Sequence, residues 1–157
     1  MLACLSLEKG NAMRRSVIVS RLCMVLVVIA AGASAQVAEP HRKAGWWEMA
    51  AHLPNGTTMT RYLCLDAAFD ARHSVLAKQK GCTQTVEAVA GGYSFKNTCG
   101  GETTTGTAIG DFNTAYKITE QRGPARIQTD ARLTGACPAG RKPGDMQMPN
   151  GTVLNLD

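Results

Sequence analysis

The stretch CTQTVEAVAGGYSFKNTC, residues 82–99, carries most of the fold information in this chain. Apolar and polar residues alternate along it with the period of a β-strand, and an Ala-Gly pair divides it near the middle. If that pair forms a two-residue turn, Val86 faces Phe95 and the two end cysteines face each other. A slip of one residue would send the apolar side chains to the other face. The stretch therefore predicts an antiparallel hairpin with a Cys82–Cys99 disulfide.

Strand-like segments continue on the N-terminal side of this hairpin. An alternating run from Gly45 reaches a Pro-Asn-Gly turn at residues 54–56, and a second run leads to Cys64. The one stretch with helical spacing follows this second run. Asp66 is placed to cap it, and it fades near Lys80.

Three more strands follow the hairpin. Turn residues at Gly110-Asp111 and Arg122-Gly123-Pro124 separate them, and the last strand ends near Thr134. We therefore expect an all-β fold, an antiparallel curved meander of about seven strands that is half-barrel or barrel-like. One short helix is expected between strands two and three.

Residues 1–35 have the three parts of a secretory signal peptide. Basic residues precede the apolar run 22–31, and Ala33-Ser34-Ala35 predicts cleavage before Gln36. The apolar run is shorter than the roughly 20 residues that span a bilayer, which disfavours the alternative of an uncleaved anchor. Met13 is a candidate for the true start. We expect a periplasmic or secreted protein with no membrane span after cleavage.

The remaining 122 residues are enough for one domain. We expect an N-terminal linker at 36–43, a β domain at 44–137 and a flexible tail at 138–157, where prolines and glycines accumulate. Residues 36–157 hold 13 Lys and Arg against 11 Asp and Glu, and these charges form no block. The sequence therefore predicts no nucleic-acid partner.

Four of the six cysteines lie beyond the leader, and an even number in an exported chain predicts two disulfides. With Cys82 joined to Cys99, elimination leaves Cys64 paired with Cys137. That bond would tie the second strand to the end of the last one. The short Cys-x-x-Cys spacing that zinc sites favour is absent from the sequence.

Several short motifs resemble one known family. They are Gly45-Trp46-Trp47-Glu48, Leu63-Cys64-Leu65-Asp66, the cysteine-bounded hairpin, Thr105-Gly106-Thr107 and the closing Gly135-Ala136-Cys137. In this order they resemble domain of unknown function 3617, a family of small exported proteins of Gram-negative bacteria, over residues 44–138. Family members often carry a Met/Pro-rich insert after the first strand, which shrinks here to residues 53–56. The resemblance implies the compartment and the fold, and it brings no catalytic residues.

A curved meander can enclose an apolar ligand pocket. The candidate residues for a ligand or partner surface are aromatic: Trp46, Trp47, Tyr62, Phe95 and Tyr116. The alternative is that they form the core. With Trp47 facing inward, strand alternation turns Trp46 outward, where it covers the helix or the tail or contacts a partner.

The two alternative functions are a periplasmic copper binder and a small hydrolase. Thioethers suit copper(I), and the weak candidate ligands are Met146, Met148, His41 and His52. A small hydrolase needs a nucleophile, a base and an orienting group, and no Ser-His-Asp set stands at a suitable spacing. We expect no cofactor, no resident metal and no catalysis. The sequence favours an exported binding or envelope accessory protein, with an unknown envelope protein or an apolar small molecule as partner.

Overall fold

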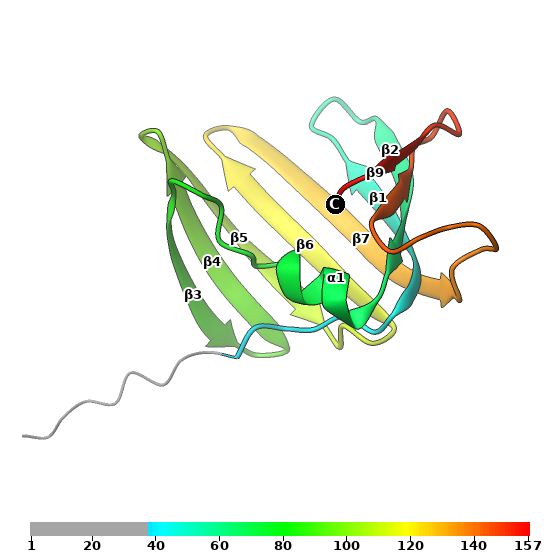
Figure 1. Cartoon of the computed structure of the whole chain (residues 1–157). Helices are drawn as coiled ribbons and strands as arrows, with labels where there is room; N and C mark the ends of the chain where they lie inside the picture. Colours follow the sequence, from blue (N-terminus) through cyan, green and yellow to red (C-terminus); the bar gives the residue numbers. More distant parts are fainter. Residues whose placement is uncertain (1–37) are drawn as a thin grey trace, which may run out of the picture. The chain divides into compact units, whose positions relative to one another are not determined.

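The computed structural model describes residues 38–157, so the expected signal peptide lies outside the described residues. Within them, nine strands form one sheet in the order β3-β4-β5-β6-β7-β1-β2-β8-β9, and neighbouring strands are antiparallel (Figure 1). The elements are β1 Gly45–His52, β2 Thr58–Leu65, α1 Ala67–Arg72, β3 Thr83–Val89, β4 Gly92–Cys99, β5 Glu102–Gly110, β6 Ala115–Arg122, β7 Ala125–Gly135, β8 Asp145–Gln147 and β9 Val153–Asn155.

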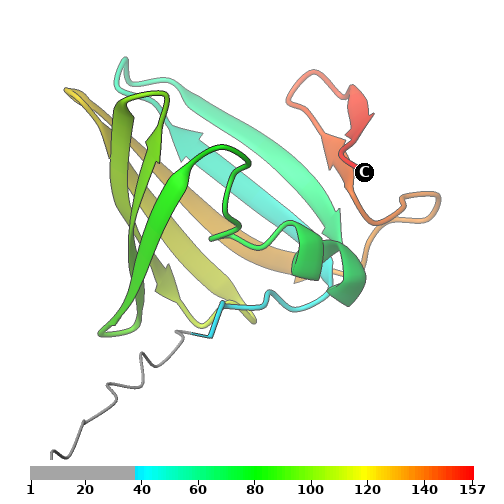
Figure 2. The same cartoon turned by 60° about the vertical axis from the view of Figure 1, so that its left-hand side comes forward.

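The expected all-β meander is confirmed, with its helix between β2 and β3. Each strand from β3 to β7 pairs with the next, and β7 then pairs with β1. The sheet is curled and not closed, since β3 and β9 are its two edges (Figure 2). The helix α1 lies on the hollow side of the curl (Figure 1). We call this side the concave face and the opposite side the convex face.

The register of the 82–99 hairpin is confirmed. Val86 pairs with Phe95, and Gly91 takes a φ of 75° in the turn, which glycine adopts without strain. Both expected disulfides are present. The Cα–Cα distance is 4.5 Å for Cys82–Cys99 and 5.5 Å for Cys64–Cys137. Two disulfides fit an oxidising extracellular compartment.

Strand alternation divides the side chains between the two faces. In β1 the buried residues Trp47, Met49 and Ala51 alternate with half-buried ones. Phe95 of β4 is also buried, and it lies over Gly106 of β5, where any Cβ would collide with the phenylalanine ring. The core thus lies on the concave face, under α1.

The helix is shorter than expected and ends at Arg72 instead of fading near Lys80. Asp66 caps its start as expected, with its carboxylate accepting from the Phe69 amide at 2.7 Å. At the other end, the Arg42 guanidinium donates to the His73 carbonyl at 2.6 Å, which satisfies an acceptor of the last turn. A side chain from outside the helix thus caps its C-terminal end.

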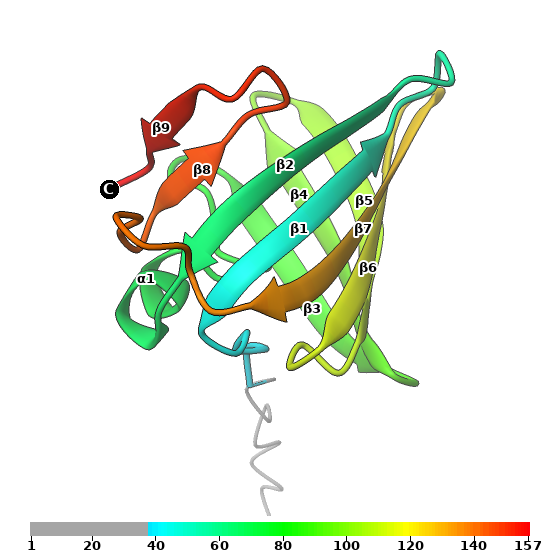
Figure 3. The same cartoon turned by 90° about the vertical axis from the view of Figure 1, so that its right-hand side faces the viewer.

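The expectation of a flexible tail at 138–157 is wrong. Residues of this segment form β8 and β9, and β8 pairs with the edge of β2 (Figure 3). The Gly144 amide donates to the Cys64 carbonyl at 2.9 Å, and Met146 packs against the core. The glycines and prolines of the segment lie mainly at its turns, and β8 covers a strand edge that would otherwise be exposed.

The expected linker 36–43 also needs correction. Its described residues lack secondary structure, but the side chain of Arg42 is buried against α1. The domain therefore extends beyond the expected boundaries 44–137 at both ends.

Candidate functional site

A hollow of about 240 Å³ lies on the concave face, between the sheet and the segment that contains α1. Strands β1, β2, β6, β7 and β8 contribute to its wall. Its apolar lining residues are Met49, Leu63, Phe69, Val75, Ile118, Met146 and Leu156. A concave site with apolar walls and a few polar groups is the usual form of a small-molecule site.

A buried ion pair fixes the helix over this hollow. Arg42 Nε lies 2.6 Å from Asp70 Oδ1, and the two residues are 8% and 1% exposed. The Arg42 amide also donates to Asp70 Oδ2 at 2.9 Å, and His41 Nδ1 lies 3.3 Å from the same oxygen. Because both charges are compensated and hydrogen-bonded, the pair fastens the expected linker to α1.

Arg61 of β2 is the second arginine of the hollow, and unlike Arg42 it forms no ion pair within residues 38–157. It pairs with Met49 of β1, so its side chain belongs to the concave face. Its Nε is buried and has no hydrogen-bond partner among residues 38–157. In the same part of the chain no ion pair involves Arg61, although Glu120 also lines the hollow.

The convex face has a broader depression of about 430 Å³, and its charges are paired. Arg132 of β7 donates to both carboxylate oxygens of Glu48 on β1, at 3.0 and 3.1 Å. The Tyr62 hydroxyl donates to the same carboxylate at 3.1 Å. Hydrogen bonds from Arg132, then from Tyr62, hold the pKa of Glu48 below its usual value despite partial burial. The bond to Glu48 raises the pKa of Tyr62.

A second group on the convex face centres on Asp130 of β7. Lys117 Nζ lies 3.3 Å from one of its oxygens, and His52 Nε2 lies 3.0 Å from the other. Partial burial raises the pKa of Asp130, but hydrogen bonds from Gln128 and Lys117 lower it by more. His52 Nδ1 also lies 3.0 Å from the Thr58 hydroxyl.

Thr58, His52 and Asp130 therefore form a hydroxyl–imidazole–carboxylate line. A hydrolase also needs a site that holds the acyl group and donors that stabilise the oxyanion. The side chains of His52 and Asp130 are 46% and 43% exposed on the strand surface, and Asp130 is shared with Lys117. The line is best interpreted as a cross-strand polar network.

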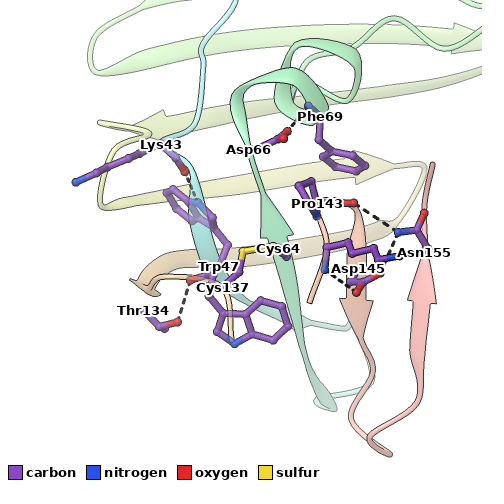
Figure 4. The surroundings of a disulfide bond; sticks show 12 residues. Lys43, Trp47, Cys64, Asp66, Phe69, Thr134, Cys137, Pro143, Asp145 and Asn155 are labelled. Carbon is purple, nitrogen blue, oxygen red and sulfur yellow. Dashed lines mark hydrogen bonds between the residues drawn. A yellow bond between two sulfur atoms is a disulfide. The ribbon is translucent and has the colours of Figure 1, made fainter. Parts of the chain in front are cut away.

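The structure divides the five candidate aromatic residues between the two faces. Trp47 and Phe95 are buried in the core, and Tyr116 lines the hollow. Figure 4 shows Trp47 Nε1 donating to the Lys43 carbonyl, at 2.8 Å. Trp46 lies on the convex face, half-buried, and stacks on Tyr62 with ring centroids 5.6 Å apart. Trp46 thus does not cover the helix, which lies on the opposite face.

The candidate copper ligands are not brought together as a set. His41 precedes β1 and contacts Asp70, whereas His52 ends β1 and contacts Asp130. Met146 packs on the core, and Met148 lies in the turn between β8 and β9, where its carbonyl accepts from Gly151. Within residues 38–157, no group of three or more His, Cys, Asp or Glu side chains is arranged to hold a metal ion.

Sequence reasoning missed Arg61 and Glu120 as residues of the hollow. A signal was present in both strands. Arg61 shares its strand parity with the apolar residues Met59, Leu63 and Leu65, so a cation interrupts the inward series of β2. Glu120 similarly continues the inward series of β6. A charge on an apolar face is the unusual observation that points to a site.

The fold and site together define a class, a disulfide-linked open β sheet that curls around a small, mainly apolar hollow. The chain matches the family model described as "Protein of unknown function (DUF3617)" over residues 42–137. It belongs to that family, as its motifs indicated. No curated protein and no solved structure matches the chain significantly. Among residues 38–157, no helix is both long and apolar enough to cross a membrane.

Proposed function

We propose that this protein is exported to the periplasm and acts there as a non-catalytic binding protein for a small, largely apolar molecule. The hollow under α1 carries this proposal, since apolar side chains from β1, β2, β6, β8 and the helix converge on it. The buried Arg42–Asp70 pair supports it, because it fixes the helix in place and leaves the hollow preformed. The leader at residues 1–35 and the two disulfides support the compartment.

The first test is native mass spectrometry of the protein expressed with its own leader in a Gram-negative host. We expect the mass of a chain that has lost residues 1–35 and carries a small apolar molecule. A retained leader would contradict the export proposal. A bound polypeptide would instead favour the role of envelope accessory protein, and bound copper would favour the metal-binding role.

A substitution that fills the hollow with a larger side chain tests whether the ligand binds on the concave face. Ile118 of β6 lines the hollow, whereas Ile109 of β5 lines the convex depression. We expect I118F to abolish uptake of a fluorescent apolar probe and I109F to leave it unchanged. V75F serves as a second filling variant, because Val75 lies outside the sheet. Unchanged uptake in both filling variants would overturn the proposed site.

A further inference from the structure

We propose that the ligand is a single-chain amphiphile with an anionic head, and that Arg61 binds that head. This inference rests on the proposed function and names the chemical class of the ligand. The hollow would take the hydrocarbon chain against Leu63, Met49 and Ile118, with the carboxylate or phosphate at the guanidinium.

The unpartnered guanidinium is the observation that carries the inference. A buried N–H without an acceptor destabilises a fold, and native structures rarely retain one without a reason. Arg61 Nε is such a group, and it lines the hollow. The planar guanidinium matches a carboxylate or phosphate with two parallel hydrogen bonds, so an anionic head satisfies it directly.

The other arginine of the hollow is not available for this role. Arg42 already donates to Asp70, to the His73 carbonyl and, at 3.5 Å, to the Tyr116 hydroxyl. Its charge is neutralised by a buried carboxylate. Arg61 is therefore the arginine of the hollow that retains capacity for an anion.

Glu120 determines where the head can lie. Across the sheet, Arg61 is in register with Met49, then Ala131, then Tyr116. Glu120 lies four residues further along β6, which corresponds to about 13 Å of strand rise. The carboxylate of Glu120 is thus displaced along the strands from Arg61. An anionic head is therefore favoured at the end of the hollow that contains Arg61.

The size of the hollow limits the ligand. At about 240 Å³ it lies below the roughly 300–1,000 Å³ of common ligand pockets, which favours one hydrocarbon chain over a two-chain lipid.

The test compares ligands with the same chain and different heads. Calorimetric titration of the exported, disulfide-bonded protein uses decanoate, decanol and decylamine. We expect decanoate to bind roughly tenfold more tightly than decanol, and decylamine to bind most weakly, because hydrogen bonds to charged groups are the stronger ones. R61Q should reduce the ratio of decanoate to decanol affinity to about one, while R61K should restore part of the preference.

The matched control is R126Q, which removes an exposed positive charge of β7 and should leave all three affinities unchanged. Decanol binding to R61Q also reports that the variant is folded. Equal binding of the three ligands, or a preference for decanoate that survives in R61Q, would overturn the role of Arg61 and retain the proposed function. Failure of all three ligands to bind the unmodified protein would overturn both.

Discussion

The two faces of the sheet use similar residues in different ways. On the convex face, Glu48 and Arg132 satisfy each other across the strands, and Trp46 stacks on a neighbouring tyrosine. On the concave face, Trp47 is fully buried, and Arg61 has a buried nitrogen with no partner among the described residues. The charges of Glu48 and Arg132 neutralise each other, so the fold alone accounts for them. The charge of Arg61 has no such partner among the described residues, and the proposed anionic ligand would supply one.

The adjacent tryptophans give the largest expected contrast between the faces. Trp47→Ala should lower the free energy of unfolding by about 3–5 kcal/mol, because it leaves a cavity in the core. Trp46→Ala removes one stacked contact and should cost about 1 kcal/mol. Urea denaturation measures both. Equal losses would contradict the division of the two side chains between core and surface.

The two ion pairs give the next contrast. Asp70→Asn should lower the free energy of unfolding by about 3 kcal/mol, because it leaves the buried Arg42 charge uncompensated. Glu48→Gln should lower it by less than about 1 kcal/mol, since its partner Arg132 is exposed. Thermal and urea unfolding of the two variants provide the comparison. A larger loss for the Glu48 variant would show that the convex pair matters more for stability.

The unpaired arginine should act in the opposite direction. Arg61→Met removes a buried donor without an acceptor and should raise the free energy of unfolding of the ligand-free protein by about 1 kcal/mol. Arg132→Met, which breaks the pair with Glu48, should give no increase. If Arg61→Met destabilises the ligand-free protein, the guanidinium has a structural role and the contrast between the faces is lost.

The smallest expected effect is in the pH dependence of stability. The folded state lowers the pKa of Glu48, chiefly through the hydrogen bond from Arg132. A lowered pKa contributes stability that is fully present above the unfolded value of about 4.3 and is lost as the pH falls through the folded value. We therefore expect the loss of stability between pH 5 and pH 3 to be smaller in Glu48→Gln. An unchanged acid slope in that variant would contradict the shift.

Local patterns made much of the fold predictable. The alternation between Cys82 and Cys99 determined the hairpin register, because only one register brings the apolar residues and the cysteines together. Strands β8 and β9 were missed because they have three residues each and lie among prolines and glycines. Their stability comes from pairing with β2, which is distant in sequence. The contact of Arg42 with the end of α1 was not predictable for the same reason, since Arg42 is distant from the helix in sequence.

The candidate site was less predictable than the fold. Of the five aromatic candidates, Tyr116 lines the hollow, and aromatic residue type alone did not distinguish wall from core. The parity of Arg61 within β2 was visible in the sequence, but whether a carboxylate faces it depends on strands far along the chain. Asp70 shows the other outcome, in which a buried charge finds its partner 28 residues away.

The most direct test of ligand binding on the concave face is a methyl NMR titration of isoleucine-labelled protein with decanoate. Ile118 lines the hollow, and Ile109 lines the convex depression on the neighbouring strand. We predict a saturable shift of the Ile118 methyl signal at stoichiometric decanoate, with the Ile109 signal unchanged. A shift of Ile109 alone, or no saturable shift of either signal, would contradict binding in the hollow.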